Sequence, residues 1–211
     1  MSIEAVIFDF GGVILDVDYE ATSLAMLHLL GPEAHLIYTK LQQSIIFDLL
    51  EIGQISPTNF YARLSEESGR ALDPADVDRA WNAMLGSTRK ERLDFIRRVG
   101  RYRRIFLLSN TNAIHKAHFD QTLAQAMKGT GEKFDDLFEK AYYSHQMGLR
   151  KPRQEIFRYL IQAHGLDPAR TLFIDDSEAN IRGAEKVGLQ VYHLHGELLE
   201  APLGHLEEPL H

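Results

Sequence analysis

Four short segments of the chain carry the side chains whose types could do chemistry. They hold carboxylates, a serine hydroxyl, an amide and a lysine ammonium: Asp9, Ser109 with Asn110, Lys151, and Asp175 with Asp176. A carboxylate can act as a nucleophile and form an acyl phosphate, and clustered carboxylates suit Mg²⁺, which prefers oxygen ligands. A hydroxyl and backbone N–H groups at a strand-to-helix turn can hold a phosphate, and a lysine can neutralise a phosphoryl group. These residue types are suited to phosphoryl transfer, which needs mainly positioning and charge neutralisation.

Three of these segments lie at the ends of runs that predict buried strands. The fourth, at Lys151, lies between two such runs. Apolar runs typical of parallel strands cover 5–10, 105–109, 141–144, 171–174 and 189–194, and helical patterns cover 90–99, 154–164 and 179–187. This alternation predicts an α/β fold with a Rossmann-like, doubly wound parallel sheet covered on both faces. Ligands of such sheets bind beyond the carboxyl ends of the strands, so the four segments are expected to meet there.

The region from 18 to 86 breaks the alternation. It shows no convincing strand but several amphipathic helical stretches, at 22–30, at 36–52, after Ser56-Pro57 and from Pro74 to Leu85. We therefore expect a small all-helical cap at 18–86, inserted after the first strand of an α/β core made of residues 1–17 and 87–211. The tail from Glu197 is expected to fray.

Composition excludes several classes of protein. The chain has 211 residues, 45% of them hydrophobic, and a net charge of −7, which argues against a general nucleic-acid binder. A basic stretch at 89–104 repeats Leu93, Ile96 and Val99 at helical spacing, which favours a packed helix with a solvated face over a nucleic-acid patch. Cysteine is absent, so disulfides, zinc-thiolate sites and cysteine nucleophiles are excluded. We see no signal peptide and no apolar run of about 18 residues, so we expect a cytoplasmic protein without a membrane partner.

The four segments resemble the motifs of the haloacid dehalogenase-like hydrolase superfamily. FDFGGVILD is similar to the first motif, LLSNTN to the second, LRKP to the third and FIDDSEANIRGA to the fourth. The resemblance runs from about Ile3 to Leu194 and includes a helical cap in the expected place.

The resemblance implies roles for individual residues. Asp9 is implied to be the phosphorylated nucleophile, Ser109 and Asn110 to bind the phosphate, and Lys151 to bridge the phosphate and Asp9. Mg²⁺ is the implied cofactor, with ligands from Asp9, the Gly11 carbonyl, Asp175 (directly or through water) and Asp176. The implied activity is that of a phosphatase acting on a small phosphorylated metabolite, as a monomer or homodimer.

Gly11 departs from the phosphatase pattern, which carries at this place a second aspartate that protonates the leaving oxygen. One explanation is a leaving group that needs little protonation, such as the anomeric oxygen of a sugar 1-phosphate, and the sequence is also similar to a subgroup of sugar-1-phosphate phosphatases. A second is that another group supplies the proton, with Asp16, Asp18, His115 and His118 as candidates. A third is that turnover is lost and phosphate binding kept, as in a phosphate sensor.

Other chemistries were weighed against a phosphatase. The 2-haloacid dehalogenases also lack the second aspartate but use no metal. The acidic pair Asp175-Asp176 favours a Mg²⁺-dependent phosphatase over such a dehalogenase. A serine hydrolase built on Ser144-His145 has no G-x-S-x-G turn to support it, and His193 with His195 lacks further metal ligands. In the cap, Phe47, Glu51, Trp81 and Asn82 are candidates to face the site and select the substrate.

Overall fold

The computed structural model describes residues 2–31 and 45–209 of the chain. Within these residues, a parallel sheet of five strands forms the centre of the fold. In spatial order the strands are β5 (Lys140–Tyr143), β4 (Arg104–Ser109), β1 (Ala5–Phe8), β6 (Thr171–Asp175) and β7 (Gln190–His193). Because β1 lies in the middle and pairs with both β4 and β6, the chain winds outward from it in both directions. The predicted α/β, doubly wound fold is confirmed.

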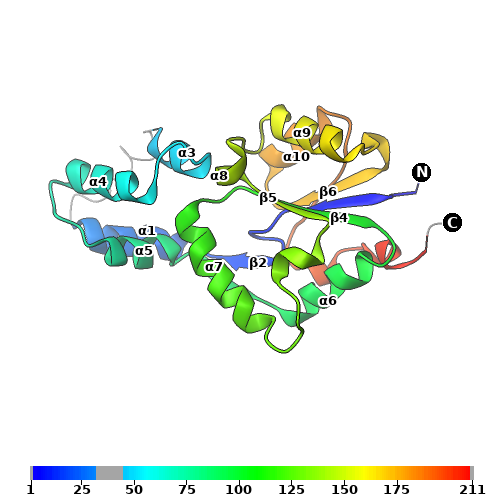
Figure 1. Cartoon of the computed structure of the whole chain (residues 1–211), viewed down its shortest axis with the longest axis horizontal. Helices are drawn as coiled ribbons and strands as arrows, with labels where there is room; N and C mark the ends of the chain where they lie inside the picture. Colours follow the sequence, from blue (N-terminus) through cyan, green and yellow to red (C-terminus); the bar gives the residue numbers. More distant parts are fainter. Residues whose placement is uncertain (1, 32–44, 210–211) are drawn as a thin grey trace.

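Helices cover both faces of this sheet. They are α6 (Lys90–Val99), α7 (Ala113–Ala126), the short α8 (Ser144–Met147), α9 (Gln154–His164) and α10 (Glu178–Glu185). Figure 1 shows α6 and α7 below the sheet and α9 and α10 above it. Successive side chains of β1 alternate between the two faces, with Val6 and Phe8 in one buried cluster and Ala5 and Ile7 in the other. The basic stretch forms α6, whose Leu93, Ile96 and Val99 are buried as the helical spacing predicts.

A second group of helices extends from one end of the sheet and has its own core. It consists of α1 (Tyr19–Leu30), α3 (Ile46–Glu51), α4 (Pro57–Ser68) and α5 (Pro74–Asn82), which share a cluster of buried side chains. Ser56 caps α4 as predicted, since its hydroxyl accepts a hydrogen bond from Asn59 N at 3.2 Å. The predicted helix at 36–52 falls partly on residues 32–44, which lie outside the described residues. The division into a core and a cap stays a prediction.

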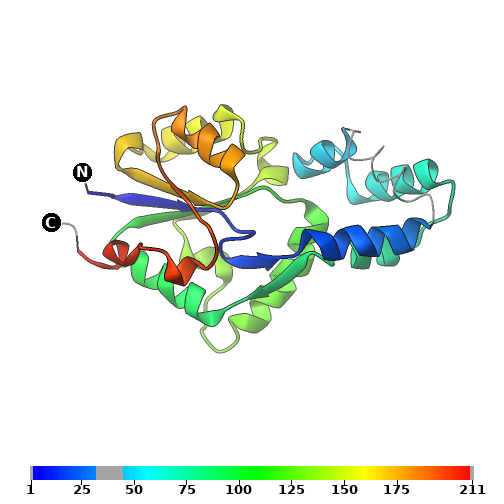
Figure 2. The ribbon, with the colours of Figure 1, turned by 180° about the vertical axis from the view of Figure 1, so that it is seen from behind.

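The two groups of helices are joined by a short antiparallel pair of strands, β2 (Leu15–Val17) and β3 (Leu85–Thr88). Figure 2 shows β2 leading directly into α1 while β3 returns beside it. The prediction that 74–85 forms one helix is wrong at its end, because α5 stops at Asn82 and the chain becomes extended at Leu85. Strands of three and four residues are too short to leave a clear alternating pattern in the sequence.

The described part of the C-terminal tail, residues 197–209, is packed rather than frayed, contrary to the prediction. It forms short 3-10 helices at Leu198–Glu200 and Gly204–Glu207, and Leu198, Leu203 and Leu206 are buried against the sheet's α6 side. Further 3-10 helices lie at Phe134–Leu137 and Pro168–Arg170.

Arg92 of α6 ties this tail to the segment that leads toward the cap. Its guanidinium donates to both carboxylate oxygens of Glu197 at 2.8 Å. It also donates to the carbonyl of Ile14 at 3.0 Å and lies 2.7 Å from Asp16 Oδ1. Among the described helices, none combines the length and the apolar character that crossing a bilayer requires.

Candidate active site

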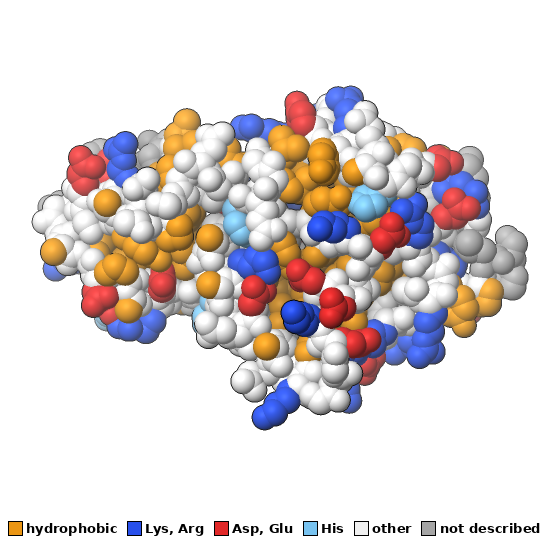
Figure 3. Space-filling model, in the orientation of Figure 1, with side chains coloured by type: hydrophobic (Ala, Val, Ile, Leu, Met, Phe, Trp, Pro, Cys, Tyr) orange, Lys and Arg blue, Asp and Glu red, His pale blue; other side chains and the backbone are white. Residues whose placement is uncertain are grey.

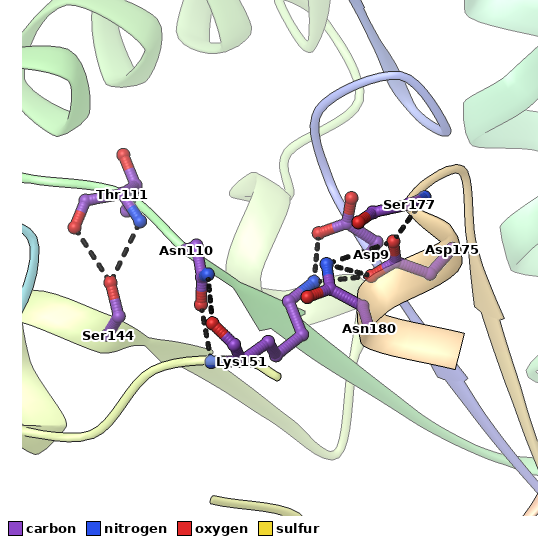
Figure 4. A network of polar contacts seen from close by, with 8 residues as sticks. All are labelled: Asp9, Asn110, Thr111, Ser144, Lys151, Asp175, Ser177 and Asn180. Carbon is purple, nitrogen blue, oxygen red and sulfur yellow. Dashed lines mark hydrogen bonds and ion pairs between the residues drawn. The ribbon is translucent and has the colours of Figure 1, made fainter. Parts of the chain in front are cut away.

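The polar residues singled out in the sequence converge beyond the carboxyl ends of β1, β4 and β6. Lys151 Nζ lies 2.5 Å from Asp9 Oδ1 and 2.7 Å from Asp175 Oδ2. One carboxylate oxygen from each of Asp9, Asp175 and Asp176 lies within 4.8 Å of the others. Figure 4 shows the Lys151 side chain reaching from its loop toward Asp9 and Asp175. The structure therefore brings an ammonium and three carboxylates, distant in sequence, to one point.

Asp175 is the most firmly held of these carboxylates. It is fully buried at the end of β6 and accepts hydrogen bonds from Ser177 N at 2.8 Å and from Asn180 Nδ2 at 3.0 and 3.1 Å, besides the contact with Lys151. Asn180 is a residue that sequence reasoning missed. Its signal was its place in the first turn of the helix that follows the acidic pair, within the segment FIDDSEANIRGA.

Asn110 holds the backbone of Lys151 with its side chain. Its amide donates to Lys151 O at 2.9 Å and accepts from Lys151 N at 2.9 Å, as the paired dashed lines in Figure 4 show. These two bonds use one N–H and one lone pair of the amide, so the side chain positions Lys151 and keeps a second N–H. Ser109 is buried at the end of β4 and lines the cavity described below.

Ser144 has a structural partner rather than a catalytic one. Its hydroxyl donates to Thr111 O at 2.8 Å and accepts from Thr111 N at 2.9 Å, which fastens the loop after β4 to the start of α8. Among the hydrogen bonds of the described residues, none joins Ser144 to His145. A serine hydrolase built on this pair thus has no support in the structure.

Two glycines follow Asp9 for different reasons. Gly12 has a φ of +75°, and a Cβ there would lie 2.1 Å from Asp176 Oδ2, so only glycine lets the turn pass so close to that carboxylate. Gly11 has an ordinary backbone conformation, and a Cβ there would lie 3.2 Å from Val17 Cγ2. A Cβ at position 11 therefore requires Val17 to move by a few tenths of an ångström, whereas a Cβ at position 12 meets a much closer contact.

The electrostatics of the cluster favour a divalent cation. Burial and the neighbouring Asp175 raise the pKa of Asp9 to about 7 despite the opposing effect of Lys151, and burial and Asp175 also raise the pKa of Asp176. Burial lowers the pKa of Lys151, but Asp9 and Asp175 outweigh it and raise that pKa above its ordinary value. Among the described residues at this point, three carboxylates face one ammonium. When all are ionised, the excess negative charge is equal in size to the positive charge of one divalent cation. The all-oxygen donor set fits Mg²⁺.

A cavity of about 560 Å³ opens from this cluster toward the helices of the predicted cap. Its far wall includes Phe47, Glu51 and Trp81, three of the candidates named for substrate selection. Asn82, the fourth, is buried and bonds His115, which lines the cavity. On the face shown in Figure 3, acidic and basic side chains are interspersed, so this face has no large area of one charge that would attract an anion.

The candidates for a substitute proton donor are dispersed. Asp18 caps α1 by accepting from Glu20 N and Ala21 N, and Asp16 pairs with Arg92. His118 is exposed. Of the four, His115 alone lines the cavity, but burial lowers its pKa to about 3, so the ring holds no extra proton to donate at neutral pH.

Known proteins match the chain over most of its length. A model of the haloacid dehalogenase-like hydrolases matches residues 3–188. A D-ribitol-5-phosphate phosphatase of Bacteroides thetaiotaomicron is 31% identical over 190 residues, which cover 90% of this chain and 91% of that protein.

Solved structures agree with the sequence matches. The crystal structure of a HAD family enzyme from Bacteroides thetaiotaomicron has a TM-score of 0.87 at 29% identity and covers 99% of this chain and 100% of its own. A structure of a wild-type HAD family enzyme from the same organism, in complex with magnesium and inorganic phosphate, has a TM-score of 0.80 at 30% identity and covers 90% and 93%. The chain belongs to the haloacid dehalogenase-like hydrolase family.

Proposed function

We propose that this protein is a Mg²⁺-dependent phosphatase that hydrolyses a small phosphorylated metabolite through an aspartyl-phosphate on Asp9. The observation that carries the proposal is the buried Lys151 ammonium within 2.7 Å of both Asp9 and Asp175, beside a third carboxylate from Asp176. The phosphatase activity named for the relative that is 31% identical, and the magnesium and phosphate bound by the structural neighbour, support the same chemistry.

Each residue of the site has a proposed role. The Asp9 carboxylate attacks phosphorus, the leaving alcohol departs, and water then hydrolyses the acyl phosphate. Lys151 neutralises charge on Asp9 and on the transferring phosphoryl group. Ser109 and the backbone of Asn110 hold the phosphate oxygens, while the side chains of Asn110 and Asn180 keep Lys151 and Asp175 in position.

Asp9, Asp176 and the Gly11 carbonyl are the proposed ligands of Mg²⁺, with Asp175 next to them. When bound, the ion supplies positive charge that offsets the carboxylates and the phosphate. Asp175 already accepts hydrogen bonds at both oxygens, so contact through a water suits it best.

The lack of a side chain at position 11 bears on the leaving group. The departing oxygen must gain a proton, and Gly11 cannot give one. A sugar 1-phosphate has less need of that proton, because the hemiacetal hydroxyl that it releases is more acidic than an ordinary alcohol and departs more readily. We propose that such esters are the first substrates to test, that residues 18–86 act as the cap over the core at 1–17 and 87–211, and that the enzyme works in the cytoplasm.

Phosphate release from a panel of phosphorylated metabolites, with Mg²⁺ and with EDTA, tests the proposal. We expect turnover with Mg²⁺, none in EDTA, and none in Asp9→Asn. Metal binding is measured separately by calorimetry with Mg²⁺ alone. Halide release from a 2-haloacid in EDTA would instead establish a dehalogenase, and beryllofluoride binding without phosphate release would establish a sensor.

A further inference from the structure

The imidazole of His115 lies in the cavity wall opposite the carboxylates and has no role in the proposed phosphoryl transfer. His115 belongs to the first turn of α7, is 7% exposed and lines the cavity. Its Nδ1 lies 2.9 Å from Asn82 Oδ1, and its ring stacks on Trp81 with a centroid distance of 5.2 Å and an interplanar angle of 10°. Two contacts from α5 therefore fix both the position and the rotation of this ring.

The contact with Asn82 also fixes the proton. The amide oxygen carries no hydrogen, so the hydrogen bond requires Nδ1 to be the donor. Burial lowers the pKa of His115 to about 3, so the ring is neutral and the second nitrogen, Nε2, keeps its lone pair. Nε2 has no hydrogen-bond partner among the described residues, and it is not one of the polar atoms sealed inside the protein. The ring thus presents a hydrogen-bond acceptor to the cavity.

The charges that line the cavity disfavour a second acidic group on the ligand. Among the described residues that line the cavity, the cations are Lys151 and Arg150. Lys151 is paired with Asp9 and Asp175, and Arg150 is paired with Asp48 and, at 3.0 Å, with Glu51. The lining of the cavity therefore has carboxylates in excess and would repel an anionic leaving group.

The remaining surface of this wall is aromatic. Trp81 stacks on Phe47 at a centroid distance of 4.9 Å and an angle of 26°, and both line the cavity. Aromatic faces contact the C–H groups of a carbon chain, while an acceptor such as Nε2 binds an O–H group. The combination suits an uncharged carbon chain that carries hydroxyl groups.

We infer that His115 is a specificity-determining residue whose Nε2 accepts a hydrogen bond from a hydroxyl of the leaving alcohol, so that the enzyme selects phosphate esters of uncharged polyols or sugars. This inference rests on the proposed function. A site built to bind a substrate hydroxyl discriminates strongly against an analogue that lacks it, because its own polar group is then left unpaired.

The test compares two esters and two matched variants. The esters are a pentitol phosphate and pentyl phosphate, which has the same carbon number and no hydroxyl groups. His115→Phe keeps an aromatic ring against Trp81 and removes the acceptor, while His118→Phe makes the same change at an exposed position three residues along α7. We expect His115→Phe to lower kcat/KM for the pentitol ester by about 10- to 100-fold and that for pentyl phosphate by less than about 2-fold. The control variant should alter neither.

Equal losses on both esters, or no loss, would overturn the inference. Failure of the wild type to release phosphate from these esters and from sugar 1-phosphates would instead refute the proposed function, and a second measurement decides the role of His115 in that case. Nitrogen NMR of the histidines should show a neutral His115 protonated at Nδ1, with an Nε2 resonance that moves when the free pentitol is added. A ring protonated at Nε2, or one that is indifferent to the pentitol, would refute the inference without any assay of turnover.

Discussion

The two walls of the cavity are built in different ways. On the core wall, Asp9, Lys151 and Asp175 come from strand ends and an adjoining loop, and hydrogen bonds from Asn110, Ser177 and Asn180 hold the set in place. On the opposite wall, His115 and Trp81 are held by ring stacking and by one hydrogen bond that His115 donates to Asn82. The core wall gathers its charged groups around one point suited to phosphorus, whereas the opposite wall offers ring faces, the acceptor of His115 and the carboxylate of Glu51.

We therefore expect the core wall to carry out phosphoryl transfer and the opposite wall to select the alcohol part of the substrate. A change in the core wall should abolish turnover of every ester, because charge neutralisation at phosphorus is common to all of them. A change in the opposite wall should alter which alcohol is released. The predictions below test that separation.

Of the substitutions below, Lys151→Ala should have the largest effect. It removes the ammonium that lies between Asp9 and Asp175, so we expect kcat to fall by about 10²- to 10³-fold on every ester. Removing one partner of a buried ion pair also costs about 3–5 kcal/mol of folding free energy, to be measured by urea unfolding. Lys186→Ala, at an exposed position, is the control. If Lys151→Ala kept a tenth of the wild-type rate, Lys151 would not belong to the machinery that all esters share.

Removal of Mg²⁺ should stop turnover at least as completely as the loss of Lys151. EDTA should abolish activity, and Mg²⁺ at 100 times its Kd should stabilise the wild type by about 2.7 kcal/mol in thermal unfolding. Asp176→Asn removes one of the clustered carboxylates and should shift the Mg²⁺ titration to higher concentration. His115→Phe should leave that titration unchanged, and a shift in this variant would show that the walls are coupled.

Gly11→Asp should increase activity on alkyl phosphates. A side chain at position 11 has room after a small movement of Val17, and a carboxyl there can protonate the leaving oxygen. General acids contribute about 10²- to 10⁴-fold in evolved sites, and we expect about 10-fold here in steady-state kcat. Gly11→Asn has the same size without the acid and should give no gain. A gain in both variants would assign the effect to packing.

His115 should make stability depend on pH. Its pKa lies near 3 in the folded protein and near 6.5 in the unfolded chain, so below pH 6.5 the unfolded chain takes up a proton that the fold excludes. This contribution to stability is complete above pH 6.5 and is lost as the pH falls toward 3. Between pH 6 and pH 5 we expect wild-type stability to fall by up to about 1.4 kcal/mol per pH unit more than that of His115→Phe. His118→Phe should keep the wild-type slope.

Much of the core wall could be predicted from sequence. Buried parallel strands leave short apolar runs, and polar residues that end such runs must lie at one edge of the sheet. All five runs are strands in the structure, although their ends differ by a few residues. Asn180 was missed because a side chain that supports a carboxylate leaves no pattern beyond its place in a helix.

The opposite wall could be predicted only as a set of candidates. The hydrogen bond between Asn82 and His115 joins residues 33 apart in the chain, which no local pattern reports. Helix α7 was also missed, because its buried side chains form a narrow stripe of Ile114, His115, Phe119 and Leu123 within a polar segment. The sequence predicts a frayed tail because the leucines that are buried there follow neither a helical nor a strand period.

Arg92 has a consequence for the order in which the molecule is completed. It contacts the chain on its way to the cap, at Ile14 and Asp16, and the last part of the chain, at Glu197. During translation the N-terminal half of the chain leaves the ribosome before Glu197 is made. Helices α1, α3, α4 and α5 can therefore form before Glu197 is present to pair with Arg92. The contacts of Arg92 are therefore completed only after Glu197 has been synthesised, and a nascent chain that already holds Asp9 lacks that carboxylate until then.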